Sequence, residues 1–254
     1  MKISVITVCH NSEPHIAKAI TSVLVQSHPD LEYILIDGGS TDRTPEIIRS
    51  FGDRINRVFS GPDKGLYDAM NKGLRMASGE VAGFLHSDDF FVNETVIAKI
   101  ARIFEQTGTD AVYGDIRYVD RNDSGRILTN RTAGTFRRWK LKMGWHPPHP
   151  AFYVKRDLLI RYGGFDDSFT ISGDYDLMLR LLAVHRIHCC YLPEVLVMMR
   201  VGGISNRSMS NIRKKWKEDH RAMKKNHFGS ILTLFLKSMR PVLHFRKSPG
   251  YLFE

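Results

Sequence analysis

The chain has 254 residues, of which 43% are hydrophobic and 10% aromatic, and these proportions exclude a disordered protein and allow one large α/β domain. Its three cysteines form neither a disulfide framework nor a zinc-binding pattern, so we expect a reducing compartment. Residues 211–254 hold eleven of the 37 Lys and Arg and three of the 27 Asp and Glu, so a nearly neutral body precedes a basic tail that carries +8 of the formal net charge of +10.

Residues 1–115 alternate short apolar runs with segments whose apolar residues recur at helical spacing. Residues 12–15 have a helix-start signature, with a hydroxyl residue, an acidic residue and a proline. The opening run meets Cys9 too soon for a signal peptide, so we expect it to be the first strand. The expected strands are 3–8, 31–36, 55–60 and 81–85, and the expected helices are 12–24, 44–51, 65–77 and 94–107. This alternation predicts an α/β fold with a mostly parallel central sheet and helices on both faces.

The pattern loosens after residue 107. Residues 122–125, Asn-Asp-Ser-Gly, are typical of a hairpin turn. Residues 132–150 form a long basic and aromatic stretch of the kind that often binds ligands. Further strands are expected at 111–118 and 151–154, and further helices at 156–162 and 175–184.

The apolar run at residues 81–90 delivers two adjacent carboxylates, Asp88 and Asp89. We expect a buried strand here, and ligands of parallel sheets gather beyond the carboxyl ends of the strands. Paired carboxylates at that rim suit a hard divalent cation that holds a phosphorylated ligand. The alternative is that the pair only opens a turn or caps the helix near Glu94.

Two further carboxylates stand at the ends of expected elements. Asp37 ends the second strand, where dinucleotide-binding folds hold a ribose, but residues 9–14 after the first strand contain no glycine, which argues against a nicotinamide cofactor. Asp37 could still bind a nucleotide, or it could form an ordinary Asp-Gly turn. Asp174 precedes a helix, where a carboxylate stays ionised and could act as a general base for an alcohol, or merely cap the helix.

The basic tail begins with residues 211–228, which are typical of an amphipathic helix, and continues with the apolar run 230–239. That run is far shorter than the ~20 residues that a membrane-spanning helix needs. It is suited to the interface of an anionic bilayer. The alternative is a helical pair that packs on the body and leaves a solvated basic face.

Taken together, the motifs resemble family 2 glycosyltransferases, the inverting enzymes with the GT-A fold, and especially the bacterial members that build exopolysaccharide, capsule or O-antigen. The resemblance spans roughly residues 2–205, and each motif is short, but all occur in the expected order. The motifs are 6–11 (ITVCHN), 36–42 (IDGGSTD), 63–73 (DKGLYDAMNKG), 77–80 (ASGE), 84–89 (FLHSDD), 149–152 (HPAF), 163–166 (GGFD) and 173–177 (GDYDL).

The resemblance implies a donor site and a catalytic base. Asp88 matches the last carboxylate of the D-x-D element, which contacts the ribose or a Mn²⁺ or Mg²⁺ ion on the diphosphate, and Asp89 would lie beside the donor sugar. Asp174 matches the catalytic base, and His149 falls on the acceptor side, where a structural histidine is the alternative. The residues implied at the nucleotide-sugar site are Thr7, Cys9, His10, Asp37, Asp63 and Asn71, with Asp88 and Asp89.

Two departures from the family pattern concern these sites. His86 stands at the first position of the D-x-D element, which leaves Asp88 as the expected metal ligand. Gly173 stands where an acidic residue usually precedes the base, so Asp174 lacks a partner that could tune it.

The resemblance also implies a domain plan and partners. We expect a GT-A catalytic domain at 1–210, with a nucleotide-binding half at about 1–115 and an acceptor half at about 116–210, followed by a basic helical tail at 211–254. The donor would be a nucleotide sugar, with a UDP-sugar favoured, and the acceptor a glycan or a polyprenyl-diphosphate-linked sugar. We expect the protein in the cytoplasm, either free or peripheral on the inner face of the plasma membrane through 211–254.

Two other functions compete with this interpretation. A nucleic-acid-binding protein could use the basic tail, but the body has no helix-turn-helix, RRM or zinc signature, so no nucleic acid is expected as a partner. A nucleotide-sugar-binding protein with a degenerate active site would explain His86 and Gly173. Donor turnover separates that protein from an enzyme.

Overall fold

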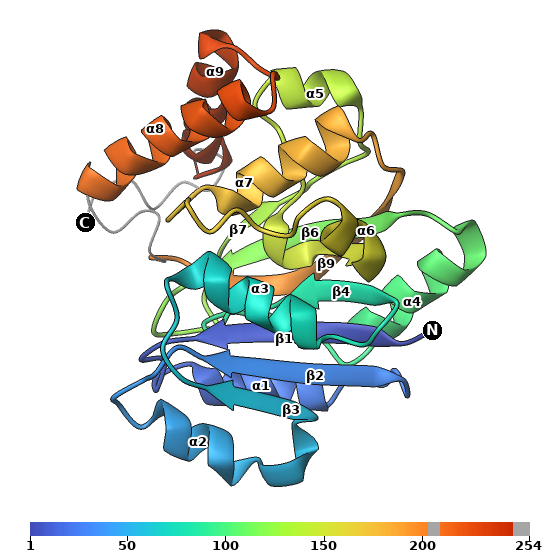
Figure 1. Cartoon of the computed structure of the whole chain (residues 1–254), viewed down its shortest axis with the longest axis vertical. Coiled ribbons are helices and arrows are strands. Elements are labelled where there is room, and N and C mark those ends of the chain that lie inside the picture. Colours follow the sequence, from blue (N-terminus) through green and yellow to red (C-terminus); the bar gives the residue numbers. More distant parts are fainter. Residues whose placement is uncertain (203–208, 246–254) are drawn as a thin grey trace.

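The computed structural model describes residues 1–202 and 209–245, and within these ranges nine strands form one sheet (Figure 1). The strand order is β3-β2-β1-β4-β8-β6-β9-β5, and β7 pairs with β6. The strands are β1 (Ile3–Cys9), β2 (Leu31–Asp37), β3 (Arg57–Ser60), β4 (Val81–Phe84), β5 (Phe90–Phe91), β6 (Ala111–Val119), β7 (Ile127–Arg131), β8 (Phe152–Lys155) and β9 (Cys189–Arg200).

Helices cover both faces of this sheet, which confirms the predicted α/β class. One face packs against α3, α7 and the segment that continues α7, and the other packs against α1 and α4. The helices are α1 (Ile16–Leu24), α2 (Thr44–Ser50), α3 (Leu66–Met76), α4 (Val96–Thr107), α5 (Arg138–Lys142), α6 (Arg156–Arg161), α7 (Gly173–Met178), α8 (Met209–Lys225) and α9 (Ile231–Phe245), with 3₁₀ turns η1 (Gly52–Arg54) and η2 (His149–Ala151) and a π-helical segment η3 (Leu179–Val184).

Strand β1 shows why both faces need cover. It is buried along its whole length, and its side chains alternate between the two cores, with Ile6 and Val8 on the α3 side and Ile3 and Val5 on the α1 side. A strand that is buried on both faces reads as a continuous apolar run, which is the pattern seen at residues 3–8.

Parallel pairing of β1 with β2 and β4 determines where the polar residues lie. The register places Cys9 opposite Asp37 and Ile6 opposite Phe84, and β2 places Asp37 opposite Ser60 of β3. The carboxyl ends of four strands therefore meet at one edge of the sheet, where ligands of such folds bind.

The second half of the sheet changes direction. Strand β8 is antiparallel to both β4 and β6, and β9 then runs parallel to β6 over most of its length. The sequence pattern indicated no element for residues 189–200, because Pro193 and Glu194 interrupt the apolar run and the register shifts beside them. The stretch 132–150, expected as a loop, contains the short helix α5 and the start of η2.

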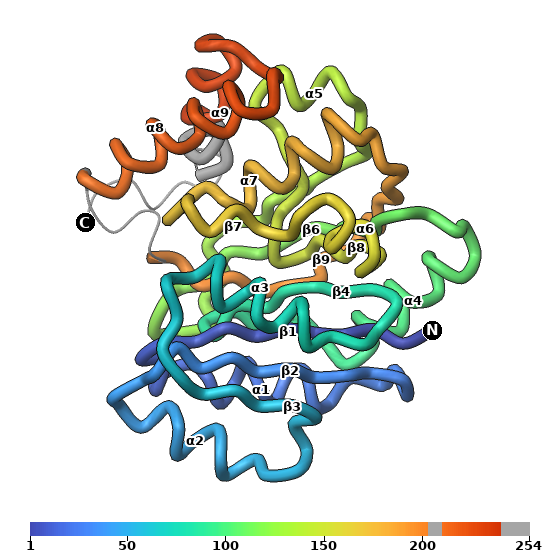
Figure 2. The backbone as a smooth tube through the Cα atoms, viewed as in Figure 1, coloured from blue at the N-terminus to red at the C-terminus, as the bar shows by residue number. Residues whose placement is uncertain are grey.

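The predicted C-terminal helical extension is present as α8 and α9, which lie beside α7 and α5 at the end of the molecule away from β3 and α2 (Figure 2). The buried face of α8 carries Glu218, Asp219, Ala222 and Met223, whereas Trp216 is 44% exposed. Residues 246–254 of the expected tail lie outside the described residues. In the described part of the chain, no helix combines the length and the apolarity that crossing a membrane requires.

Candidate functional site

Several of the residues predicted to bind the nucleotide lie at the carboxyl ends of β1 and β2. Three of them, Thr7, Cys9 and Asp37, are buried. Thr7 is fully buried, and its Oγ1 accepts a hydrogen bond from the Tyr33 hydroxyl at 3.1 Å. The Cys9 thiol lies 3.9 Å from Asp37 Oδ1, and burial raises the pKa of this thiol well above its usual range, as does the nearby Asp37 charge. These buried side chains support the site from the interior of the protein.

Asp37 is also fully buried, and both of its oxygens are engaged. Oδ1 accepts from the Ser40 backbone N–H at 3.1 Å and from the Ser40 hydroxyl, and Oδ2 accepts from the Ser60 hydroxyl at 2.6 Å. Asp37 therefore fixes the turn that follows β2 and joins it to the end of β3.

Asp63 and His10 are the more accessible predicted residues at this end. A Cβ on Gly38 would lie 2.2 Å from Asp63 Oδ2, so the carboxylate rests directly on the Gly38 backbone, and only glycine permits this approach. The exposed His10 ring places Nδ1 3.1 Å from the Gly38 carbonyl oxygen. The two side chains flank the open backbone of the turn, as a site for a planar base requires.

The adjacent carboxylates Asp88 and Asp89 occupy different environments. The Asp88 side chain is 29% exposed, and its Oδ2 lies 3.9 Å from Arg121 Nη1. Asp89 is 1% exposed, and its Oδ1 accepts from the Arg200 backbone N–H at 3.2 Å. Burial, followed by the Asp88 charge, raises the pKa of Asp89 well above its usual range. The side chain expected beside a donor sugar is therefore enclosed by protein, and Asp88 is the carboxylate of this pair that reaches the edge.

Sequence reasoning missed two arginines beside Asp88. Arg200, at the end of β9, is 6% exposed, and its Nη1 donates to the Asp88 carbonyl oxygen at 2.6 Å. Arg121, in the β6–β7 turn, donates to the Gly202 carbonyl oxygen at 3.2 Å. No sequence motif marks either residue, because both reach Asp88 only through the pairing of β6 with β9.

The surroundings of Asp88 suit one kind of divalent cation site and not another. Within residues 1–202 and 209–245, no three His, Cys, Asp or Glu side chains come together as a metal site. Mg²⁺, however, is commonly bound by one or two carboxylates, with water and substrate phosphates as the other ligands. The partly exposed Asp88 carboxylate fits that second arrangement.

Two histidines, His86 and His149, lie close to each other and within electrostatic range of Asp174. The His86 and His149 rings lie 5.6 Å apart, and His149 also packs against Phe84 and Phe165. Burial lowers the pKa of His86, whereas the charges of Asp88 and Asp174 raise it, so His86 lies within electrostatic range of both carboxylates. The fold thus brings together two acidic residues that are 86 positions apart.

Asp174 lies in the first turn of α7 and is only partly buried. Its Oδ1 accepts from the Tyr175 backbone N–H at 2.8 Å and lies 3.4 Å from the Tyr67 hydroxyl oxygen, which also donates to the Ile171 carbonyl at 2.7 Å. A Cβ at Gly173 would lie 2.8 Å from the Tyr67 ring. The missing acidic residue before Asp174 therefore has a steric reason, since Tyr67 fills that space.

Asn71, predicted at the donor site, is engaged with the chain itself. Its Nδ2 donates to the Phe165 carbonyl at 2.8 Å, and its Oδ1 accepts from the Phe165 N–H at 2.9 Å. This pair anchors the turn that presses Phe165 against Tyr67 and His149. The binding roles of Asn71 and of the other residues above remain predictions.

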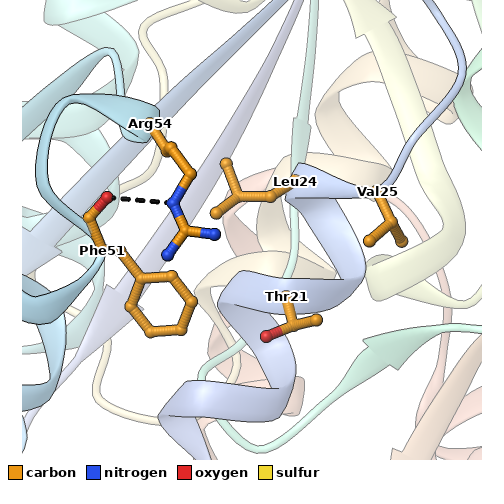
Figure 3. Close-up of a pocket in the computed structure, with 5 residues that line it drawn as sticks. All are labelled: Thr21, Leu24, Val25, Phe51 and Arg54. Carbon is orange, nitrogen blue, oxygen red and sulfur yellow. Dashed lines mark hydrogen bonds between the residues drawn. The ribbon is translucent and has the colours of Figure 1, made fainter.

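Two cavities in the described part of the structure are lined by none of the predicted site residues. One, of about 300 Å³, is lined by Thr21, Leu24, Val25, Phe51 and Arg54, and there Arg54 Nε donates to the Phe51 carbonyl (Figure 3). It lies where α1 and α2 end, at the opposite edge of the sheet from Asp88. The other, of about 360 Å³, lies at the α8–α9 junction.

Known glycosyltransferases are similar to this chain in sequence. Residues 4–169 match the family model for glycosyl transferase family 2. A PGL/p-HBAD biosynthesis glycosyltransferase of Mycobacterium tuberculosis is 29% identical over 192 residues, which are 74% of this chain and 72% of that protein. An uncharacterized glycosyltransferase of the same species is 31% identical over 186 residues, covering 72% and 69% of the two chains.

Solved structures share the fold at lower identity. Staphylococcus aureus TarS 1-349, crystallised with UDP-GlcNAc, superposes with a TM-score of 0.70 at 19% identity over 89% of this chain, which spans 65% of that one. The mannosyltransferase PcManGT of Pyrobaculum calidifontis, in complex with GDP-Man and Mn²⁺, gives 0.64 at 17% identity over 99% of this chain and 76% of its own. These likenesses confirm the predicted GT-A fold.

His149 gives a test of the site's burial. Burial lowers the pKa of His149 to about 4, the Asp174 charge opposes this shift, and His86 adds to it. In the unfolded chain, His149 has an ordinary pKa near 6.5. Between pH 6.5 and about 4, this side chain is therefore protonated in the unfolded chain and neutral in the folded protein. Stability from neutral His149 is therefore present above pH 6.5 and is lost as the pH falls towards about 4.

Lowering the pH from 7 to 4 reduces the free energy of unfolding of each protein. We expect this reduction to be about 3 kcal/mol smaller in His149→Phe, which keeps the aromatic contacts, than in the wild type. Urea unfolding at a series of pH values measures the difference, and the comparison at pH 7.5, where both chains are neutral at this position, corrects for packing. Parallel pH dependences in the two proteins would show that His149 titrates normally.

Proposed function

The chain belongs to glycosyl transferase family 2, and on that premise we propose that it is an inverting glycosyltransferase that moves a sugar from a nucleotide-sugar donor to a glycan or lipid-linked acceptor. The observation that carries the proposal is a continuous row of packed rings that runs from His86, two residues before Asp88, to Asp174. The His86 and His149 rings lie 5.6 Å apart. Phe165 packs against both His149 and Tyr67. The Tyr67 hydroxyl lies 3.4 Å from Asp174 Oδ1. One carboxylate stands at the sheet edge where a diphosphate would lie, and the other stands where an attacking hydroxyl would arrive.

The donor is a nucleotide sugar, with a UDP-sugar favoured. TarS was crystallised with UDP-GlcNAc and PcManGT with GDP-Man, and both share this fold. His10 and Asp63 would contact the base and ribose at the Gly38 turn, with Thr7, Cys9 and Asp37 supporting the turn from the interior. Asn71 would hold the wall of the site through its pair with Phe165.

The diphosphate would lie beside Asp88, where Arg121 and Arg200 supply positive charge. Asp88 would hold a Mn²⁺ or Mg²⁺ ion, with phosphate oxygens and water as the other ligands. When bound, such an ion stabilises the negative charge of the departing nucleoside diphosphate. Asp89, which is buried and bonded to the Arg200 backbone, would keep Arg200 in place rather than touch the sugar itself.

Asp174 is the general base of the proposed reaction. Its two described hydrogen bonds fall on Oδ1, so we assign Oδ2 to the acceptor hydroxyl. The acceptor oxygen forms a bond to the anomeric carbon from the face opposite the diphosphate, its proton passes to Asp174, and the electron pair of the breaking bond leaves with the diphosphate oxygen. The anomeric centre is therefore inverted.

The two halves of the chain contribute different parts of this site. His10, Asp63 and Asp88 come from residues 1–115, which we assign to the nucleotide, and His149 and Asp174 come from 116–210, which we assign to the acceptor. The buried His149, whose Nε2 has no hydrogen-bond partner among the described residues, would contact an acceptor only through its ring edge.

The acceptor is proposed to be carried by a lipid, as in cell-surface polysaccharide synthesis, with the protein on the inner face of the plasma membrane. Helix α9 exposes Ile231 (72%), Leu232 (63%) and Phe235 (56%). Helix α5 exposes Trp139 (62%), and Gly144, two residues beyond the end of α5, packs against Lys237 of α9. The exposed Lys224 of α8 lines the same cavity as Ile231. Exposed apolar residues beside a lysine match an anionic bilayer interface.

The test of the proposed reaction is Asp174→Asn. The amide cannot accept the proton, so we expect kcat to fall by about 10²–10⁴-fold while donor binding is retained. Release of nucleoside diphosphate from UDP- and GDP-sugars, with octyl glycosides as acceptors, measures turnover, and thermal shift with the donor measures binding. Asp167→Asn, at an exposed position in the same half, is the matched control. Turnover of wild-type size in Asp174→Asn would remove Asp174 from the role.

The membrane contact is tested with the double variant Leu232→Gln and Phe235→Gln. We expect its binding to phosphatidylglycerol vesicles to weaken by about tenfold or more, because burying two large apolar side chains contributes more than the ~1.4 kcal/mol that a factor of ten requires. Vesicle co-sedimentation measures binding, and Val184→Gln, at an exposed valine on η3, is the control. Equal binding by wild type and double variant would refute the contact through α9.

A further inference from the structure

Helix α8 holds the backbone segment that leads into Asp174. Glu218, which is 8% exposed, accepts three successive backbone N–H groups on Oε2, from Thr170 at 3.1 Å, Ile171 at 2.8 Å and Ser172 at 3.0 Å. Its Oε1 also lies 3.1 Å from the Thr170 nitrogen. A carboxylate that accepts several amide protons forms charge-assisted hydrogen bonds, which are shorter and stronger than neutral ones.

The same segment is held from the opposite side by α3. The Tyr67 hydroxyl donates to the Ile171 carbonyl and lies 3.4 Å from Asp174 Oδ1. Burial raises the pKa of Tyr67 well above its usual range, and the charges of Asp174 and Glu218 add to this, so the hydroxyl keeps its proton and remains a donor. Residues 170–172 thus lie between a donor on α3 and an acceptor on α8.

Further contacts keep α8 in register with α7. Asp176, which is fully buried, accepts from Asn226 Nδ2 at 2.8 Å and lies 3.4 Å from Lys225 Nζ. Lys237 of α9 pairs with Asp219 of α8, and its ammonium lies 4.0 Å from the centre of the Tyr175 ring. The C-terminal helices therefore contact α7 at the adjacent residues Tyr175 and Asp176, and these contacts involve buried charged groups of both α8 and α9.

We propose that Glu218 is a positioning residue for sugar transfer and that α8 completes the active site. The inference rests on the proposed function, because it assigns the effect of Glu218 to the placement of the Asp174 carboxylate. Glycine at position 173 leaves Asp174 without an acidic neighbour in sequence, and Glu218 brings a carboxylate to the same segment from α8. Removal of residues 211–254 would therefore abolish transfer even to an acceptor that is free in solution.

The test compares Glu218→Ala with Glu218→Gln, whose amide oxygen can still accept the N–H groups. We expect Glu218→Ala to lower kcat by about 100-fold with little change in donor KM, since a small misplacement of a reacting group costs that much. Glu218→Gln should recover a large part of kcat. The assay is nucleoside diphosphate release with octyl glycoside acceptors, and hydrogen exchange at residues 170–172 reports directly on whether the segment is held.

Two controls on α8 separate positioning from stability. Met223→Ala removes a buried side chain of α8 that packs beside Gly229, so it lowers the unfolding midpoint and leaves the Glu218 carboxylate in place. His220→Ala changes an exposed residue of α8 two positions beyond Glu218. Both should keep the wild-type kcat and the wild-type exchange at 170–172 at temperatures where they are folded.

The outcomes distinguish this inference from the function on which it rests. Loss of kcat in Glu218→Ala, partial recovery in Glu218→Gln and faster exchange at 170–172 would support it. An active wild type with Glu218→Ala no worse than Met223→Ala would overturn the positioning role alone. A wild type that releases no nucleoside diphosphate from any UDP- or GDP-sugar would overturn the proposed function, and the inference with it.

Discussion

The parallel pairing of β1 with β2 and β4 is the constraint on which the site depends. It aligns Cys9 with Asp37 and brings the end of β4 beside them, so residues far apart in the chain share one edge of the sheet. A slip of one residue in either pair would turn the alternating side chains of one strand to the wrong cores and misalign the carboxyl ends of β1, β2 and β4. The burial of Ile3, Val5, Ile6 and Val8 on two faces makes that register costly to change.

The second half of the chain has to position Asp174, the proposed base, and it does so through the buried face of α7 together with polar contacts of the preceding segment. Strand β8 reverses direction beside β4, and Asp174 in the first turn of α7 lies 3.4 Å from the Tyr67 hydroxyl of α3. The segment before Asp174 is held by Tyr67 on one side and Glu218 on the other, so the position of the base depends on helices from both ends of the chain. The C-terminal helices are accordingly part of the body as well as a candidate membrane surface.

Sequence reasoning predicted the first half well, because apolar runs and helix-start signals are local patterns. The strand β1, the helix α3 and the edge position of Asp88 follow from such patterns, and in the second half so does the place of Asp174 at the start of a helix. It missed β9, where Pro193 and Glu194 break the alternation, and with it Arg200. It also could not predict that the side chains of Asp37, Asp89 and Asn71 form hydrogen bonds within the protein. Nor could it predict that Glu218 accepts hydrogen bonds from residues 170–172, because such contacts form only when distant segments pack together.

The most direct test of the account is whether the edge formed by β1, β2 and β4 binds a nucleoside diphosphate beside Asp88. Thermal unfolding with UDP, GDP and CMP and their sugar conjugates, with and without Mn²⁺ or Mg²⁺, measures this for wild type and Asp88→Ala, since a ligand of the folded state raises the midpoint. The account predicts a rise with one nucleotide class that depends on the metal ion and is lost in Asp88→Ala. No rise with any of these ligands, with or without metal, would contradict it.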